Sequence, residues 1–164
     1  DLIVVHAISL PPGEFGGGYI DRLFQNRLDP AEHPYFRSIT RLDVSSHFLI
    51  ERSGLLKQFV STRFRAWHCG ESSFEGRSAC NDFSIGIELE GSDEQPFTSA
   101  QYEALTGVLV ELSVHYPAVN SSRIVGHSDI ASGRKTDPGP QFEWQRMRNM
   151  LRDKLRAQAG GKPQ

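Results

Sequence analysis

Two short runs of apolar residues each lead directly into a histidine. Residues 2–5 are Leu-Ile-Val-Val and precede His6, and residues 124–126 are Ile-Val-Gly and precede His127. Apolar runs of this length, rich in β-branched side chains, are typical of strands that are buried on both faces. The pattern therefore predicts two buried strands, each ending at a histidine.

Residues 84–90, Ser-Ile-Gly-Ile-Glu-Leu-Glu, alternate between aliphatic and other positions. Because successive side chains of a strand point to opposite faces, Glu88 and Glu90 share one face and the aliphatic side chains share the other. Two further apolar runs, at residues 48–50 and 59–60, flank the turn-forming pair Ser53-Gly54. They predict a β-hairpin.

Helical periodicity appears in later segments. Thr98 and Gln101 form a capping-box motif that opens a long apolar stripe. A last helix is expected to open at Pro140, and a short helix is expected after Asp29-Pro30, limited by Pro34. Strands that interleave with helices, together with a hairpin, predict an α/β fold, a single-domain mixed β-sheet flanked by helices.

Composition narrows the class of protein. The chain has 164 residues, is 38% hydrophobic and carries a formal net charge of -2, which argues against a disordered chain and a strongly basic nucleic-acid binder. No run of about 18 apolar residues is present, so no transmembrane helix is predicted. We expect a monomer with neither nucleic acid nor membrane as partner, with residues 1–157 forming the domain and 158–164 a flexible tail. Cys69 and Cys80 indicate free thiols in a reducing compartment.

The two histidines at the strand ends are candidate metal ligands. Neighbouring parallel strands lie about 4.8 Å apart, so two imidazoles could reach one zinc ion at roughly 2.0–2.1 Å each. A catalytic zinc site needs a third protein ligand and one open position. Asp129 and Asp137 both follow His127, and the spacing alone does not choose between them. Either histidine taken alone is as well explained by a structural or surface role.

Three charged residues have both a structural and a functional interpretation. Glu88 and Glu90 could form a solvated sheet face, or one carboxylate could act as a general base near the metal. Lys135 could be a surface lysine or, two residues from Asp137, could stabilise an oxyanion. His68 lies in the aromatic loop at residues 65–70, which could contact a ligand.

Other catalytic motifs are missing from the sequence. It contains no Gly-x-Ser-x-Gly nucleophile elbow, no Gly-Lys-Ser/Thr after Gly16-Gly17-Gly18 and no Cys-x-x-Cys pair. Cys69 follows His68 directly, and adjacency in sequence does not predict that the thiol and the imidazole point together as a Cys–His hydrolase requires.

Several longer segments form a specific set. They are Val-Val-His-Ala-Ile-Ser-Leu-Pro-Pro-Gly-Glu-Phe-Gly-Gly at 4–17, Asp29-Pro30 with His33-Pro34, Arg-Ala-Trp-His at 65–68, Cys-Asn-Asp-Phe-Ser-Ile-Gly-Ile-Glu-Leu-Glu-Gly at 80–91, Gly-His-Ser-Asp-Ile-Ala at 126–131 and Arg-Lys-Thr-Asp-Pro-Gly at 134–139. In this order they strongly resemble the AmpD-type N-acetylmuramoyl-L-alanine amidases. The resemblance covers residues 2 to about 150.

The resemblance implies the fold shared with peptidoglycan recognition proteins and one catalytic Zn²⁺ held by His6, His127 and Asp137. It implies that Glu88 is the base and that Lys135 stabilises the oxyanion. The implied reaction is hydrolysis of the amide between N-acetylmuramic acid, in its 1,6-anhydro form, and L-alanine of small muropeptides. The implied setting is cytoplasmic recycling of cell-wall fragments.

Three positions depart from the usual family pattern. Ala7 stands where Asn is usual, Ser128 where Cys is usual and Ser132 where Pro is usual. Ala7 offers no side-chain hydrogen bond to a sugar. The alternatives are a non-catalytic peptidoglycan-binding module of the same fold, a periplasmic amidase on intact peptidoglycan, and a different zinc hydrolase such as a peptidase.

Overall fold

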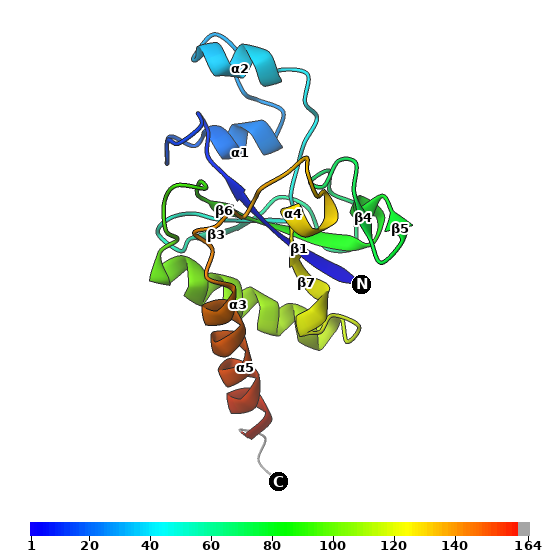
Figure 1. The fold of residues 1–164 in the computed structure, drawn as a ribbon. Coiled ribbons are helices and arrows are strands. Elements are labelled where there is room, and N and C mark those ends of the chain that lie inside the picture. Colours follow the sequence, from blue (N-terminus) through cyan, green and yellow to red (C-terminus); the bar gives the residue numbers. More distant parts are fainter. Residues whose placement is uncertain (161–164) are drawn as a thin grey trace.

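Five strands form the central sheet of the computed structural model, which describes residues 1–160 of the chain (Figure 1). Across the sheet, the order is β3 (Leu56–Gln58), β2 (Phe48–Ile50), β6 (Ser84–Glu90), β1 (Leu2–Ile8) and β7 (Ile124–Gly126). Neighbouring strands are parallel except β2 and β3, which form an antiparallel hairpin. The predicted mixed sheet and hairpin are therefore confirmed.

Helices lie on both faces of this sheet (Figure 1). One face is covered by α3 (Ser99–His115) and α5 (Trp144–Gly160), and the other by α1 (Tyr19–Phe24), α2 (Pro34–Ile39) and α4 (His127–Ile130). A small two-stranded sheet of β4 (Ser73–Phe74) and β5 (Arg77–Ser78) and the 3₁₀ turns Cys80–Asp82 and Ser121–Arg123 complete the fold. Within residues 1–160, none of the helices is both long enough and apolar enough to cross a membrane.

The alternation along β1 and β6 separates the core from the site. Ile3 and Val5 of β1, with Ile85 and Ile87 of β6, pack in one cluster with the buried stripes of α3 and α5. The alternate positions of both strands face the other side, where His6 of β1 is the register partner of Glu88 of β6. Strand periodicity thus places an imidazole and a carboxylate side by side on the face opposite the main core.

The capping box at the start of α3 is confirmed, because the Thr98 side chain accepts a hydrogen bond from Gln101 N–H and the Gln101 side chain accepts one from Thr98 N–H. The prediction for the last helix is wrong at its start, since α5 begins at Trp144 rather than Pro140. Residues 140–143 instead precede the helix as a non-helical segment. Its buried Phe142 packs against Tyr102, and the Tyr102 hydroxyl accepts a hydrogen bond from Glu143 N–H.

Three further boundaries differ from the predictions. The second hairpin strand is at 56–58 rather than 59–60, because a hydrogen bond from Glu51 N–H to the Leu55 carbonyl closes the turn early. The expected helix after Asp29 begins at Pro34, since Asp29 Oδ1 instead accepts a hydrogen bond from Ala31 N–H in a turn. Residues 158–160 of the expected tail are helical, and 161–164 lie outside the described residues.

Candidate metal centre

Three side-chain donor atoms meet at one point on the site face of the sheet. His6 Nδ1 lies 3.0 Å from His127 Nδ1 and 3.0 Å from Asp137 Oδ2, and His127 Nδ1 lies 3.1 Å from the same oxygen. Both imidazoles are buried, with exposed fractions of 1% for His6 and 3% for His127. The residues come from three separate segments of the chain.

The sheet explains how the two histidines meet. Val5 of β1 is the register partner of Gly126 of β7, so the next residue of each segment is a histidine at the same edge. The prediction that His6 ends its strand is wrong: β1 continues to Ile8, because it pairs with β6 over its full length. His127 does follow the end of β7, where it opens α4.

Backbone geometry decides which of the two aspartates lies beside the histidines. A hydrogen bond from Ser128 N–H to the Asp137 carbonyl, 2.9 Å long, holds the loop of Asp137 beside His127. Asp129 has a different role, since its carboxylate is exposed and accepts a 2.7 Å hydrogen bond from Gly126 N–H. Of the two aspartates that the spacing left open, Asp137 is therefore the one that joins the histidines.

These donors fit a zinc ion. Two imidazole nitrogens and one carboxylate oxygen are a donor set found in catalytic zinc sites, which keep a fourth position open. Donors around a tetrahedral ion at 2.0–2.1 Å stand about 3.3–3.4 Å apart, close to the 3.0–3.1 Å spacing of these three atoms. The group is one of two sets of potential metal donors within residues 1–160.

Charge and burial favour the metal-binding protonation states of two of these donors, His6 and Asp137. Burial lowers the pKa of His6, which favours the neutral ring with one free lone pair, and the Asp137 contact only partly offsets this. Burial alone would raise the pKa of Asp137, but its close contacts with His127 and His6 hold it below its ordinary value. Neutral imidazoles beside an ionised carboxylate are the forms that bind zinc.

Glu88 lies next to this group without belonging to it. Its Oε1 atom is 4.0 Å from His6 Nδ1. Burial, reinforced by the Asp137 carboxylate, raises the pKa of Glu88 well above its ordinary value, and Lys135 acts in the opposite direction. A carboxyl group with a raised pKa beside a candidate metal site has the properties of a general base and acid.

A solvated face for the two glutamates is excluded, because both are buried, at 7% exposure for Glu88 and 5% for Glu90. The Glu90 carboxylate accepts hydrogen bonds from Gly16 N–H at 2.6 Å and Arg52 N–H at 3.1 Å. Glu90 therefore holds two loops at the end of β6, because each of its carboxylate oxygens accepts a hydrogen bond from one of them.

The five residues singled out from the sequence all line one cavity of about 230 Å³. They are His6, Glu88, His127, Lys135 and Asp137. Lys135 is an exposed residue of the loop before Asp137. Ala7 lines the same cavity, and its methyl group also packs against the main core.

The sequence predicted only part of the cavity wall, since Trp67 lies in the loop at residues 65–70 that was expected to contact a ligand. Tyr35, Leu42 and Trp67 line the cavity with side chains that are 40%, 51% and 53% exposed. The Arg65 guanidinium carbon lies 3.9 Å from the centroid of the Trp67 ring. Exposed apolar side chains gathered at a cavity are typical of a ligand-binding surface. Sequence pattern gave no sign of Tyr35 or Leu42, because single exposed apolar residues are common.

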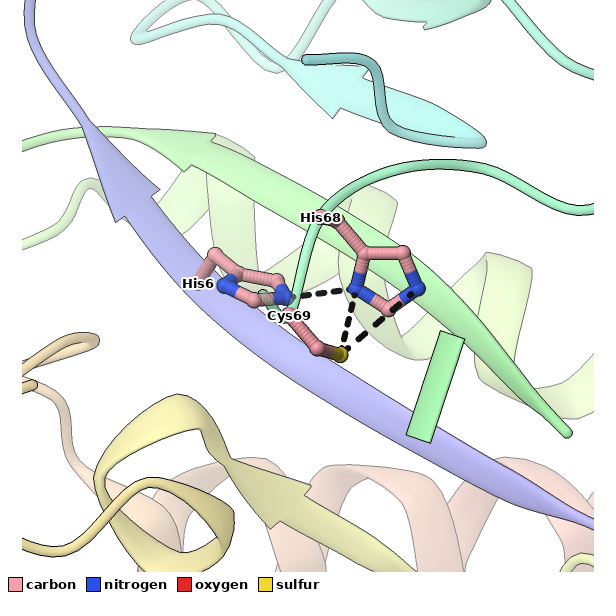
Figure 2. A group of neighbouring side chains, drawn as sticks. All are labelled: His6, His68 and Cys69. Carbon is pink, nitrogen blue, oxygen red and sulfur yellow. Dashed lines mark hydrogen bonds between the residues drawn. The ribbon is translucent and has the colours of Figure 1, made fainter. Parts of the chain in front are cut away.

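His68 and Cys69 form the second set of potential donors together with His6 (Figure 2). His68 Nδ1 lies 2.9 Å from His6 Nε2 and 3.1 Å from Cys69 Sγ, so the thiol and the imidazole lie closer than their adjacency in sequence predicted. Burial raises the pKa of the Cys69 thiol, which disfavours the thiolate that a nucleophile requires. Both Cys69 and Cys80 are free and buried, in agreement with the expected thiols.

A larger cavity of about 510 Å³ lies elsewhere, between α3 and α5, and is lined mainly by apolar side chains and by arginines of α5. It contains neither of the two donor sets found in residues 1–160. Size therefore does not identify the site, and we place the chemistry in the smaller cavity, where the donor atoms converge.

Comparison with known proteins agrees with this geometry. The model of the N-acetylmuramoyl-L-alanine amidase family matches residues 1–140, which include every residue of the site. The chain belongs to the N-acetylmuramoyl-L-alanine amidase family. A relative from Haemophilus influenzae, named 1,6-anhydro-N-acetylmuramyl-L-alanine amidase AmpD, is 56% identical over 145 residues, which are 88% of this chain and 79% of the relative.

The fold of this amidase is similar to the folds of solved amidase structures. A crystal structure of a selenomethionine derivative of AmpD has a TM-score of 0.89 and 55% sequence identity, covering 92% of this chain and 83% of that one. The amidase AmiD from Escherichia coli, in complex with the substrate anhydro-N-acetylmuramic acid-L-Ala-D-γ-Glu-L-Lys, has a TM-score of 0.68 and 29% identity, covering 92% of this chain and 56% of that one. The predicted amidase-like α/β fold is thereby confirmed.

Proposed function

We propose that this amidase hydrolyses the amide bond between the lactyl group of 1,6-anhydro-N-acetylmuramic acid and L-alanine in small muropeptides, with Zn²⁺ held by His6, His127 and Asp137. The observation that carries the proposal is the meeting of three zinc-type donors, a buried glutamate and a lysine in one cavity. The relatives named for this substrate, at 53–56% identity, support the substrate class.

The reaction needs an electrophile, a base and a stabilised oxyanion. When bound, Zn²⁺ supplies Lewis acidity, which polarises a carbonyl oxygen and allows water to act as a nucleophile near neutral pH. Glu88 is placed to accept a proton from the attacking water and to deliver it to the amine nitrogen as the C–N bond breaks. Lys135 at the cavity wall provides positive charge for the oxygen of the former carbonyl.

Metal content and product identity test this proposal. The purified protein should contain close to one zinc per chain, and His127→Ala should lose it. An anhydro-muropeptide should yield intact stem peptide beginning with L-alanine, identified by mass spectrometry, and a chelator should abolish the reaction. Full zinc occupancy in His127→Ala would contradict the ligand assignment, and cleavage within the peptide would indicate a peptidase.

The setting that we propose is cytoplasmic recycling of cell-wall fragments. It is supported by the two buried free thiols, whereas the relatives' names bear only on the 1,6-anhydro substrate. A non-catalytic binding module of the same fold is disfavoured, because all three donors and Glu88 are present and adjacent. Equal turnover of intact peptidoglycan and of anhydro-muropeptide would instead favour a periplasmic amidase.

A further inference from the structure

One loop lies behind both histidine ligands. His68 and Cys69 are consecutive, and each presents an acceptor to the far side of one imidazole. His68 Nδ1 lies 2.9 Å from His6 Nε2 (Figure 2), and the Cys69 carbonyl accepts a 2.9 Å hydrogen bond from His127 Nε2. The loop is itself fixed, because the buried Asn81 Oδ1 accepts hydrogen bonds from the N–H groups of His68 at 3.1 Å and Cys69 at 2.9 Å.

The position of each proton follows from the partners. A neutral imidazole has one donor nitrogen and one acceptor nitrogen. The Cys69 carbonyl can only accept, so His127 carries its proton on Nε2 and its Nδ1 lone pair faces Asp137 and His6. If His6 Nδ1 is to offer a lone pair at the same point, His6 Nε2 must carry the proton and His68 Nδ1 must accept it.

The hydrogen bonds beyond His68 are consistent with this assignment. With Nδ1 as acceptor, His68 carries its proton on Nε2, which lies 3.3 Å from Ser84 Oγ. Ser84 donates its own hydroxyl proton to the Cys80 carbonyl at 2.6 Å, so its oxygen is free to accept. Each nitrogen and oxygen in the series therefore has a compatible partner, with the Cys69 thiol sharing His68 Nδ1 as acceptor, and the series ends on a backbone carbonyl.

We propose that His68 is a positioning residue for the zinc site, which fixes the tautomer and the ring orientation of His6 by accepting its Nε2 proton. This inference rests on the zinc ligands of the proposed function. Ligand histidines usually donate their second ring N–H to a carboxylate, carbonyl or water, and loss of such partners typically weakens metal affinity about 10–100-fold. In this chain the partner is a second imidazole.

The sheet is shaped to admit this imidazole. A Cβ atom added at Gly86 of β6 would lie 2.5 Å from His68 Cγ and 2.5 Å from His68 Nδ1. Only glycine at this position lets the His68 ring lie against the strand and reach His6. His47 packs edge-to-face against His68, with ring centroids 5.6 Å apart, and its Nδ1 accepts a hydrogen bond from Gly86 N–H.

The set of His6, His68 and Cys69 competes with the zinc site for one residue. His6 would have to bind through Nε2 in that set and through Nδ1 with His127 and Asp137. A neutral imidazole has a lone pair on only one of its nitrogens, so both sets cannot be filled through neutral His6. The assignment of His68 as a hydrogen-bond acceptor thus excludes the set of His6, His68 and Cys69 as a second zinc site.

Three substitutions of His68 separate its possible roles. His68→Asn keeps an acceptor at the Nδ1 position, His68→Gln places its amide at the Nε2 position, and His68→Leu keeps neither. Zinc dissociation constants, measured by competition with a chelator, should rise about 10–100-fold in the Gln and Leu variants and stay within about threefold of the parent value in the Asn variant. His115→Leu, on the exposed end of α3, is the matched control.

The outcomes are distinguishable from failure of the proposed function. Thermal unfolding of the metal-free variants reports any general loss of folding, and a loss of affinity in His68→Asn equal to that in His68→Leu would assign His68 a packing role only. Parent-like affinity in His68→Leu, with zinc lost in His127→Ala, would overturn the role of His68 alone. Thiolate-to-cobalt absorption in the Co²⁺-substituted parent would place the metal on Cys69 and overturn the assignment.

Discussion

Substitution of Glu88 by glutamine removes a proton acceptor without changing the size of the side chain. The Glu88 carboxylate lies 4.0 Å from His6 Nδ1, beside the donor set but outside it. Glu88→Gln should therefore keep one zinc per chain and lose activity by about 10²–10⁴-fold, the range for loss of a general base. That loss corresponds to about 2.7–5.5 kcal/mol of transition-state stabilisation.

Stability of the metal-free protein should change in the opposite direction. Burial and the Asp137 carboxylate raise the pKa of Glu88 well above its ordinary value of 4.5. The charged form is thus disfavoured by folding, and the stability of the parent falls as pH rises from about 4.5 through the folded-state pKa. Glutamine carries no such penalty, so the variant should be at least as stable as the parent at pH 7. The difference should vanish below about pH 4.5.

Three measurements check this prediction: metal analysis, kcat on a purified anhydro-muropeptide, and urea unfolding of the metal-free proteins across this pH range. Glu90→Gln is the matched control on the same strand face, and because Glu90 binds two backbone N–H groups it should lose stability with a much smaller effect on kcat. Parent-like activity in Glu88→Gln, or inactivity that comes with loss of zinc, would show that Glu88 is not the base.

Three further substitutions test other parts of the structure. Lys135→Ala should retain zinc and lower kcat about 10²–10³-fold, and a loss confined to KM would mean that Lys135 binds the ground state instead. Ala7→Asn should lower KM several-fold with unchanged zinc content, because one neutral hydrogen bond is worth about 0.5–1.5 kcal/mol; an unchanged KM would show that the sugar does not contact residue 7. Thr98→Ala removes the cap of α3 and should lower the free energy of unfolding by about 0.5–2 kcal/mol in a urea titration, with kcat unchanged.

The faces of the strands and the start of α3 follow from the sequence alone, whereas the ends of several other elements do not. The alternation at 84–90 separates Ile85 and Ile87, which enter the main core, from Glu88, which faces the site. The capping box of Thr98 and Gln101 fixes the start of α3 through contacts between residues three positions apart. These features were predictable because periodicity and capping depend on neighbours within a few residues along the chain.

Tertiary structure decided which side chains meet. The spacing after His127 left Asp129 and Asp137 equally open, and the choice depends on the Ser128–Asp137 backbone hydrogen bond and on the use of Asp129 by Gly126. His68, 62 residues from His6, was no more than part of a loop that could contact a ligand.

The burial of Glu90 likewise required the structure, since it depends on Gly16, 74 residues away. The pattern along the chain predicts which face of the sheet a side chain occupies. Which residue it contacts there depends on the register between strands, and on the placement of loops, that are far apart in sequence. The donor atoms of this site meet through such long-range contacts, since His6 and Asp137 are 131 residues apart in the chain.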